Sequence, residues 1–242
     1  KVSLSYADQR KLLKIDELPI RQLSTLFEVI KVIYCAPEDH LLISGSPRFR
    51  RQYFDLAISQ LYPSYINVLR HFLHIVQQRN AMLKRSYSRA EIASWNLSFA
   101  SSLAEVWNYR KRYLIQVNTA FQETFKDIFP ASTAISLVYL PSLKLPLESS
   151  PEEIIKHLAP IEEREKLLQR SLAGAHLDDY EFKLKGRKML TYASQGQKRI
   201  AVIILKLIQA RLIENVTGIK PIMLFDDIFA ELDTFHSQQI RN

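Results

Sequence analysis

The chain has 242 residues, of which 47% are hydrophobic and 24% charged, which excludes a disordered or fibrous protein and allows one large domain or two lobes. Lys and Arg total 33 against 25 Asp and Glu, and the net charge of +8 suits a polyanionic partner such as nucleic acid. The single cysteine, Cys35, fits a cytoplasmic protein, and no apolar run approaches the ~18 residues of a membrane span.

The first zone, residues 1–46, reads as β-rich. Strand-like pieces at Val2 to Tyr6, Leu12 to Ile15 and Val29 to Cys35 are separated by turn signals. We expect this zone to form part of a β-rich lobe.

The second zone, residues 47–130, changes to helical periodicity. Phe54, Ile58 and Leu61 are spaced by four and three residues, as on the buried face of a helix. Ser88 and Glu91 have the spacing of a capping box and predict the start of another helix. We expect a helical lobe here.

The third zone, residues 131–242, mixes strands and helices. Ile135 to Leu140 predicts a strand, and Ser150-Pro151-Glu152-Glu153 predicts a helix start with a serine cap. A pair of short helices is expected to end near Gly174. The alternation of Tyr180 to Leu184 then predicts a strand that ends at a turn.

The most informative stretch follows. Ser194-Gln195-Gly196-Gln197 opens a long apolar helix, and a helix N-terminus beside glycine offers unsatisfied N–H groups to an anion. The next strand, Ile222 to Phe225, is predicted to be buried and ends on Asp226 and Asp227. Paired carboxylates at such a point can hold hydrated Mg²⁺ and position a water. The alternative is that Ser194 and the Asp pair only cap helices.

An ordered set of motifs carries a family resemblance. The motifs are Ala36-Pro37-Glu38-Asp39, Gly45-Ser46-Pro47, Arg50-Arg51, Phe54-Asp55, Gln78-Arg79-Asn80, Leu83-Lys84, Gly174, His176-Leu177-Asp178-Asp179, Phe182, Gly186, Ala193 to Gln197, Arg199, Pro221 to Asp227, and Ala230-Glu231-Leu232-Asp233. Together they resemble the bacterial RecF recombination mediators. The resemblance covers nearly the whole chain in the same order.

The resemblance implies an α/β, ABC/SMC-like ATPase head with a helical second lobe. Such a head dimerises around two ATP molecules, binds single-stranded or gapped DNA, and helps recombination mediator proteins load recombinase. Ser194, Gln195, Gly196 and Gln197 match the signature that contacts the γ-phosphate held by the opposite subunit. Asp226 would hold Mg²⁺ through water, Asp227 would polarise the attacking water, alone or with another group, and Asp233 would lie in the D-loop at the interface.

The chain also departs from the family. It contains no G-x-x-x-x-G-K-[ST] loop, so it is not competent to cradle a triphosphate alone. In the family that loop precedes the position of Lys1, and we expect a segment of a longer protein. Gly174-Ala175-His176-Leu177 replaces Gly-Pro-His-Arg, which leaves His176 and Asp178 as supporting or interface groups. The alternatives are a non-hydrolysing DNA-binding or protein-docking scaffold, or another SMC-like repair ATPase.

Basic residues of the helical zone are the candidates for DNA contact, because Lys and Arg neutralise phosphates without reading sequence. For Arg50 and Arg51 an ion pair within the lobe is the alternative. The candidates are Arg50, Arg51, Arg79, Lys84, Arg85, Arg110, Lys111 and Arg112.

Overall fold

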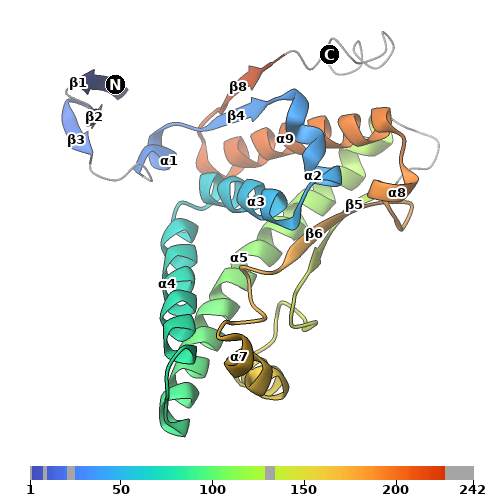
Figure 1. Cartoon of the computed structure of the whole chain (residues 1–242). Helices are drawn as coiled ribbons and strands as arrows, with labels where there is room; N and C mark the ends of the chain where they lie inside the picture. The colour runs from blue at the N-terminus through green and yellow to red at the C-terminus, as the bar shows by residue number, and fades with distance from the viewer. Residues whose placement is uncertain (1, 8–9, 21–24, 129–133, 227–242) are drawn as a thin grey trace.

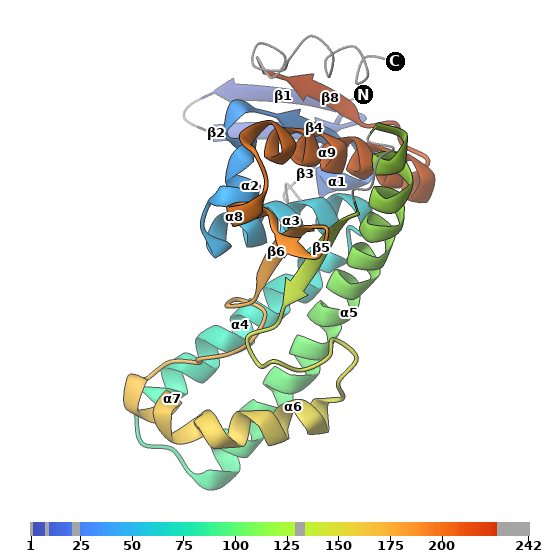
Figure 2. The same ribbon diagram turned by 90° about the vertical axis from the view of Figure 1, so that its right-hand side faces the viewer.

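A computed structural model of the chain describes residues 2–7, 10–20, 25–128 and 134–226. Strands and the long helix α9 lie in one part of the molecule, and an arm of helices extends from it (Figure 1). The view turned by a quarter shows α6 and α7 across the far end of this arm (Figure 2). Within the described ranges, no helix combines the length and apolarity needed to cross a membrane.

The described strands and helices are interspersed along the chain, with α2 to α5 following one another without an intervening strand. The strands are β1 (Val2–Ala7), β2 (Arg10–Ile15), β3 (Leu18–Ile20), β4 (Val32–Cys35), β5 (Ile135–Leu140), β6 (Asp179–Leu184), β7 (Arg187–Lys188) and β8 (Ile222–Phe225). The helices are α1 (Leu26–Val29), α2 (Leu41–Ser44), α3 (Pro47–Leu61), α4 (Tyr65–Leu83), α5 (Arg89–Ile128), α6 (Pro151–Leu158), α7 (Glu162–Leu168), α8 (Met189–Tyr192) and α9 (Gln195–Thr217), with 3₁₀ turns η2 (Pro37–His40) and η3 (Ala159–Ile161).

The described strands form three small sheets. β1, β2 and β3 pair antiparallel, as do β5, β6 and β7. β4 and β8, which are far apart in sequence, pair parallel from Val32 opposite Ile222 to Cys35 opposite Phe225. Parallel strands present their carboxyl ends at one edge, where ligands bind in open α/β sheets. The turn after β4 and the residue after β8 therefore share that edge.

Helix α9 lies in the core. Every residue from Ile200 to Lys206 is buried, and an apolar helix without a polar face belongs inside a protein. It packs against α3 and α5. Gly218 ends it with a φ of +69°, a left-handed conformation that glycine adopts without a Cβ penalty.

Helices α3, α4 and α5 follow the predicted helical periodicity. Ser46 caps α3 by accepting a hydrogen bond from the Phe49 N–H at 3.4 Å, and α3 ends just before Pro63. Phe54 and Ile58 are fully buried, as their spacing predicts, which contributes roughly 1.5–3 kcal/mol for each side chain. α4 and α5 pack side by side along the arm (Figures 1 and 2).

Three local predictions need correction. Val29 ends the short helix α1 and does not belong to strand β4. Ser88 accepts a hydrogen bond from the Glu91 N–H at 3.1 Å, as predicted. The Glu91 carboxylate, however, forms an ion pair with Arg85, and this pair replaces the second hydrogen bond expected of a capping box. Helix α7 ends at Leu168, well before Gly174. Gly174 instead has a φ of +121° and lies where a Cβ would come within 2.6 Å of the Phe99 ring.

Candidate functional site

The tip of α9 is an exposed helix N-terminus. Ser194 is its cap: the Ser194 Oγ accepts from the Gln197 N–H at 3.2 Å, and the Gln197 Oε1 accepts from the Ser194 N–H at 3.0 Å. The helix start predicted at Ser194 is confirmed, and Ser194, Gln195 and Gly196 are all exposed. The Ser194 hydroxyl accepts one bond here and keeps its own O–H to donate.

Gly196 has no packing reason within the described chain. A Cβ at this position would meet no heavy atom within 4 Å, and the residue has no positive φ. Glycine costs up to about 1 kcal/mol relative to alanine inside a helix. The first N–H groups of a helix also lack intrahelical acceptors. The tip therefore offers approachable backbone N–H groups and a partial positive charge to an outside anion.

Asp226 lies at the carboxyl edge of the β4–β8 pair. Its N–H continues the ladder to the Cys35 carbonyl at 2.9 Å, and its Oδ2 accepts from the Tyr34 hydroxyl at 2.5 Å. This hydrogen bond to a carboxylate raises the pKa of Tyr34. Sequence reasoning missed Tyr34. The alternation of side chains along β4 places it on the exposed face of the strand, together with Val32. Asp227 and Asp233 lie outside the described residues.

Strand β8 is exposed, which corrects the prediction of a buried strand. Ile222, Leu224 and Phe225 keep 54%, 48% and 44% of their surface. The reason is that β4 is the one strand that pairs with β8 among the described residues. No group of three or more His, Cys, Asp or Glu side chains in these residues is placed to hold a metal ion. Asp226 thus offers a single carboxylate, which suits Mg²⁺ that keeps most of its waters.

Lys206 joins α9 to this edge. Its buried ammonium donates to the Asp39 Oδ2 and to the Tyr34 carbonyl, and Asp39 also accepts from the Ala36 N–H at 2.7 Å. Lys206 lies twelve residues after Ser194, so about 18 Å of helix separates the α9 tip from the edge that carries Asp226. A single chain does not bring the two predicted nucleotide-contacting groups together.

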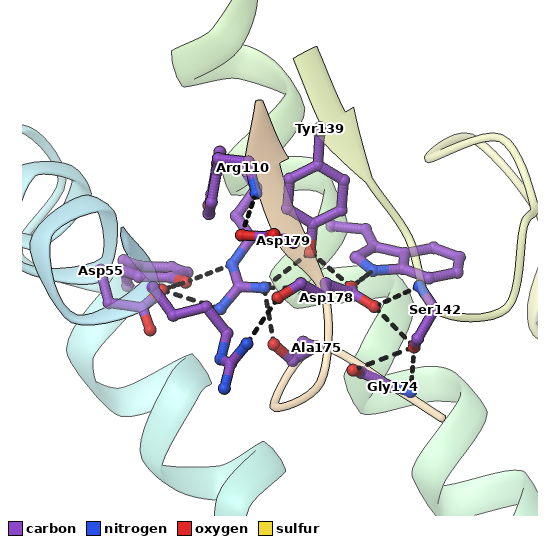
Figure 3. Close-up of polar contacts among 12 residues, drawn as sticks. Asp55, Arg110, Tyr139, Ser142, Gly174, Ala175, Asp178 and Asp179 are labelled. Atoms are coloured by element: carbon purple, nitrogen blue, oxygen red, sulfur yellow. Dashed lines mark hydrogen bonds and ion pairs between the residues drawn. The ribbon is translucent and has the colours of Figure 1, made fainter. Parts of the chain in front are cut away.

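A buried polar network surrounds Asp178, whose side chain is fully enclosed (Figure 3). The carboxylate accepts from Trp107 Nε1 at 2.8 Å, from the Tyr139 hydroxyl, and from the N–H and hydroxyl of Ser142 at 2.6 and 2.7 Å. Arg110 donates to the Tyr139 hydroxyl at 2.6 Å. The network joins α5, β5 and the segment before β6, and it gives Asp178 a structural role.

Four of the predicted DNA-contacting arginines are committed to internal partners. Arg50 binds both oxygens of Asp179 at 2.7 and 2.8 Å, and Arg51 donates to the Asp178 carbonyl at 2.8 Å. The other two are buried: Arg79 pairs with Glu165, Asn96 and Ser171, and Arg110 pairs with Asp55, Tyr65, Tyr139 and Ala175. The structure corrects the DNA-contact prediction for Arg79 and Arg110, because their guanidinium groups are enclosed.

The other four candidates lie on or near the surface. Arg85 pairs with Glu91 and Lys111 with Glu148, while Arg112 stacks over the Tyr62 ring with 4.8 Å from its guanidinium carbon to the ring centroid. Lys84 is exposed beyond the end of α4. DNA contact by these residues stays a prediction.

His176 is largely buried near the Asp178 network. Its ring lies 5.9 Å from that of Phe72, and its buried Nδ1 has no hydrogen-bond partner in the described chain. Burial lowers the pKa of His176 to about 4, because it disfavours the charged ring more than nearby Asp178 stabilises it. A neutral imidazole at this depth acts as a packing residue.

Comparison with known proteins places the chain in a family. No family model matches the sequence. A protein of Acetivibrio thermocellus described as DNA replication and repair protein RecF is 30% identical over 255 residues, which covers 100% of this chain and 69% of that protein. The chain belongs to the RecF family. Proteins of the same description from Streptococcus gordonii (34% identical) and Ruminiclostridium cellulolyticum (30%) are matched over 92% and 94% of the chain.

The chain spans less than two thirds of the length of those two RecF relatives, 62% and 63%. Two solved RecF structures share its fold. One described as RecF-ATP has a TM-score of 0.88 at 23% identity over 99% of the chain, and one described as RecF-ATPrS has 0.85 at 24% over 96%. The α/β, ABC-ATPase-like fold with a helical lobe is thereby confirmed. Both solved proteins are described as recombination mediators of the RecFOR pathway.

Sequence reasoning missed one basic surface within this RecF-family chain. Lys183, Lys185, Arg187 and Lys188 lie on the β6–β7 hairpin. The signal was available, since cations recur at alternate positions of a predicted strand and its turn.

Proposed function

We propose that the chain is the greater part of an ATP-dependent DNA-binding head that acts in DNA repair and recombination. The exposed tip of α9 carries this proposal, because a Cβ on Gly196 would meet no heavy atom of the described residues within 4 Å. A glycine that weakens a helix without relieving any internal contact fits a close approach by an outside ligand. Membership of the RecF family and the ATP-bound description of a structural relative supply the ligand: the triphosphate of ATP.

The nucleotide site in this proposal is shared between two copies. The Ser194 hydroxyl can donate to a phosphate oxygen, and the N–H groups at Gln195 and Gly196 can bind the same anion. Because about 18 Å of helix separates this tip from the Asp226 edge, the tip would serve the nucleotide of the opposite subunit. Dimerisation would then depend on ATP, and Asp233 would lie at the interface.

The edge of the β4–β8 pair that carries Asp226 would bind Mg²⁺ and orient the attacking water. Asp226 is exposed, and the Tyr34 hydroxyl donates to its Oδ2, so its Oδ1 would be the oxygen that meets the hydration shell of Mg²⁺. When bound, Mg²⁺ neutralises charge on the phosphate oxygens. Asp227 would orient the attacking water, with slow turnover because an aspartate reaches less far than a glutamate. Changing Asp227 to Asn should therefore preserve ATP-dependent dimerisation and slow hydrolysis.

The proposed partners are gapped or single-stranded DNA and the recombination mediator proteins, with recombinase loading as the outcome. The net charge of +8 supports a polyanionic partner. Within the helical lobe, Lys84, Arg85, Lys111 and Arg112 remain as candidates because they are not enclosed.

Sedimentation of the full-length protein tests this proposal. We expect a shift from monomer to dimer when ATP and Mg²⁺ are added, and none for Ser194→Arg, whose side chain would occupy the phosphate position. Ser88→Arg is the matched control, because Ser88 is also an exposed helix cap and lies far along the chain from α9. If the Ser194→Arg variant formed dimers at the same ATP concentration as the wild-type protein, the shared site would be refuted. A protein that binds DNA equally with and without ATP would favour the passive scaffold.

A further inference from the structure

The hairpin between β6 and β7 concentrates positive charge. We define the hairpin patch as Lys183, Lys185, Arg187, Lys188 and Tyr192. Glu181 is shared by Lys183 and Lys188, at 3.8 and 2.7 Å. No acidic side chain in the described ranges pairs with Lys185 or Arg187, and both are exposed. The patch therefore keeps a surplus of positive charge that a polyanion can neutralise.

Lys185, in the turn of this hairpin, has an uncommon backbone conformation. Lys185 and Gly186 have φ values of +52° and +74°, as in the two-residue turn that joins twisted strands. Glycine or asparagine is preferred at both positions, and a lysine there is conformationally unfavourable. The Lys185 N–H bonds the Ala134 carbonyl at 2.9 Å, which fixes the turn. A lysine held in this backbone conformation motivates a functional hypothesis for its side chain.

An aromatic ring stands beside the cations. Tyr192 keeps 46% of its surface, and the Arg187 guanidinium lies 4.9 Å from its ring centroid. Helix α8 is held in place because the Lys198 ammonium donates to the Leu190 carbonyl at 2.8 Å. Lysines and arginines that follow a backbone, next to an exposed ring that can stack on a base, are the elements of single-strand binding surfaces.

We propose that the hairpin patch binds the sugar–phosphate backbone of a single DNA strand and that Tyr192 stacks on one of its bases. The proposal rests on the proposed function, for which it names a DNA site outside the helical lobe. Lys185 and Arg187 neutralise two phosphates. Tyr192 precedes the α9 cap by two residues, so a strand on the patch lies beside the helix tip that would meet nucleotide (Figure 1).

DNA binding by the full-length protein tests the phosphate contacts. The probe is a fluorescent single-stranded oligonucleotide, titrated with protein at several salt concentrations in the presence of ATP. Lys185→Asn with Arg187→Gln removes two charges and gives the turn a residue that it favours, so the fold should be retained. We expect the slope of log affinity against log salt to fall by about 1.4, and affinity at 0.1 M salt to fall about 25-fold.

Lys156→Gln with Arg164→Gln is the control, since both residues are exposed on α6 and α7 and the charge change is equal. It should bind DNA as the wild type does. An unchanged slope and affinity for the hairpin variant would overturn the patch and leave DNA binding by the protein intact. Failure of the wild type itself to bind DNA would overturn both this proposal and the proposed function.

Tyr192 is tested separately. Tyr192→Ala should weaken binding of the single strand about fivefold or more and leave blunt duplex binding unchanged, because only unpaired bases can stack on the ring. Tyr192→Phe should restore wild-type binding. An equal loss on both DNA forms, or no loss on either, would refute the stacking role.

Discussion

Removing the Asp178 carboxylate should destabilise the protein more than any surface change. In Asp178→Ala, the Trp107 N–H, the Tyr139 hydroxyl and the Ser142 donors lose a buried acceptor. Each buried donor left unpaired costs about 1–3 kcal/mol, and part of that cost is recovered when the hydroxyls rotate to new partners. Arg110, with one nitrogen 4.0 Å away, also loses a compensating charge. We expect a loss of about 4 kcal/mol.

Urea unfolding of the full-length protein at neutral pH, followed by tryptophan fluorescence, measures this loss. Asp178→Asn keeps one acceptor oxygen and should lose about half as much. Glu148→Ala is the control: Glu148 pairs with Lys111 but keeps 57% of its side-chain surface, so its loss should stay below about 1 kcal/mol. If Asp178→Ala proved as mild as Glu148→Ala, the network would not hold the helical arm to the sheet.

Two further predictions concern the helix tip and the buried histidine. Gly196→Ala should fold normally and gain up to about 1 kcal/mol of helix stability, yet show weaker ATP-dependent dimerisation by sedimentation, because its methyl group lies where nucleotide would approach. For His176, the folded pKa of about 4 lies below the usual 6.5, so the unfolded state binds the proton first as pH falls. Wild-type stability should therefore lose about 3 kcal/mol between pH 6.5 and 4 that His176→Gln retains, measured by urea unfolding against an exposed-site control, His157→Gln. If the free energy of unfolding depended on pH equally in the wild type and in His176→Gln, protonation of the imidazole would not destabilise the folded protein.

The sequence predicted best what is local. The serine caps at Ser150 and Ser194 can be predicted from the sequence because cap and partner lie three residues apart. The roles of Arg79 and Arg110 cannot, because Arg79 meets Glu165 86 residues later and Arg110 meets Asp55 55 residues earlier. Whether an arginine is buried depends on partners that are distant in sequence, whereas the composition gives only its charge.

The closeness of the hairpin patch and the α9 tip leads to a last prediction about coupling. Tyr192 and Ser194 are joined through the end of α8, which Lys198 anchors to α9, so DNA on the patch and nucleotide at the tip would act on one rigid segment. If DNA favours the nucleotide-bound dimer by some factor, linkage requires ATP to favour DNA binding by the same factor. Both affinities can be measured at equilibrium in the full-length Asp227→Asn variant, where hydrolysis is slow. We expect equal factors that disappear together in Lys185→Asn with Arg187→Gln. Coupling that survives the loss of these two cations would mean that DNA acts on the dimer from another surface.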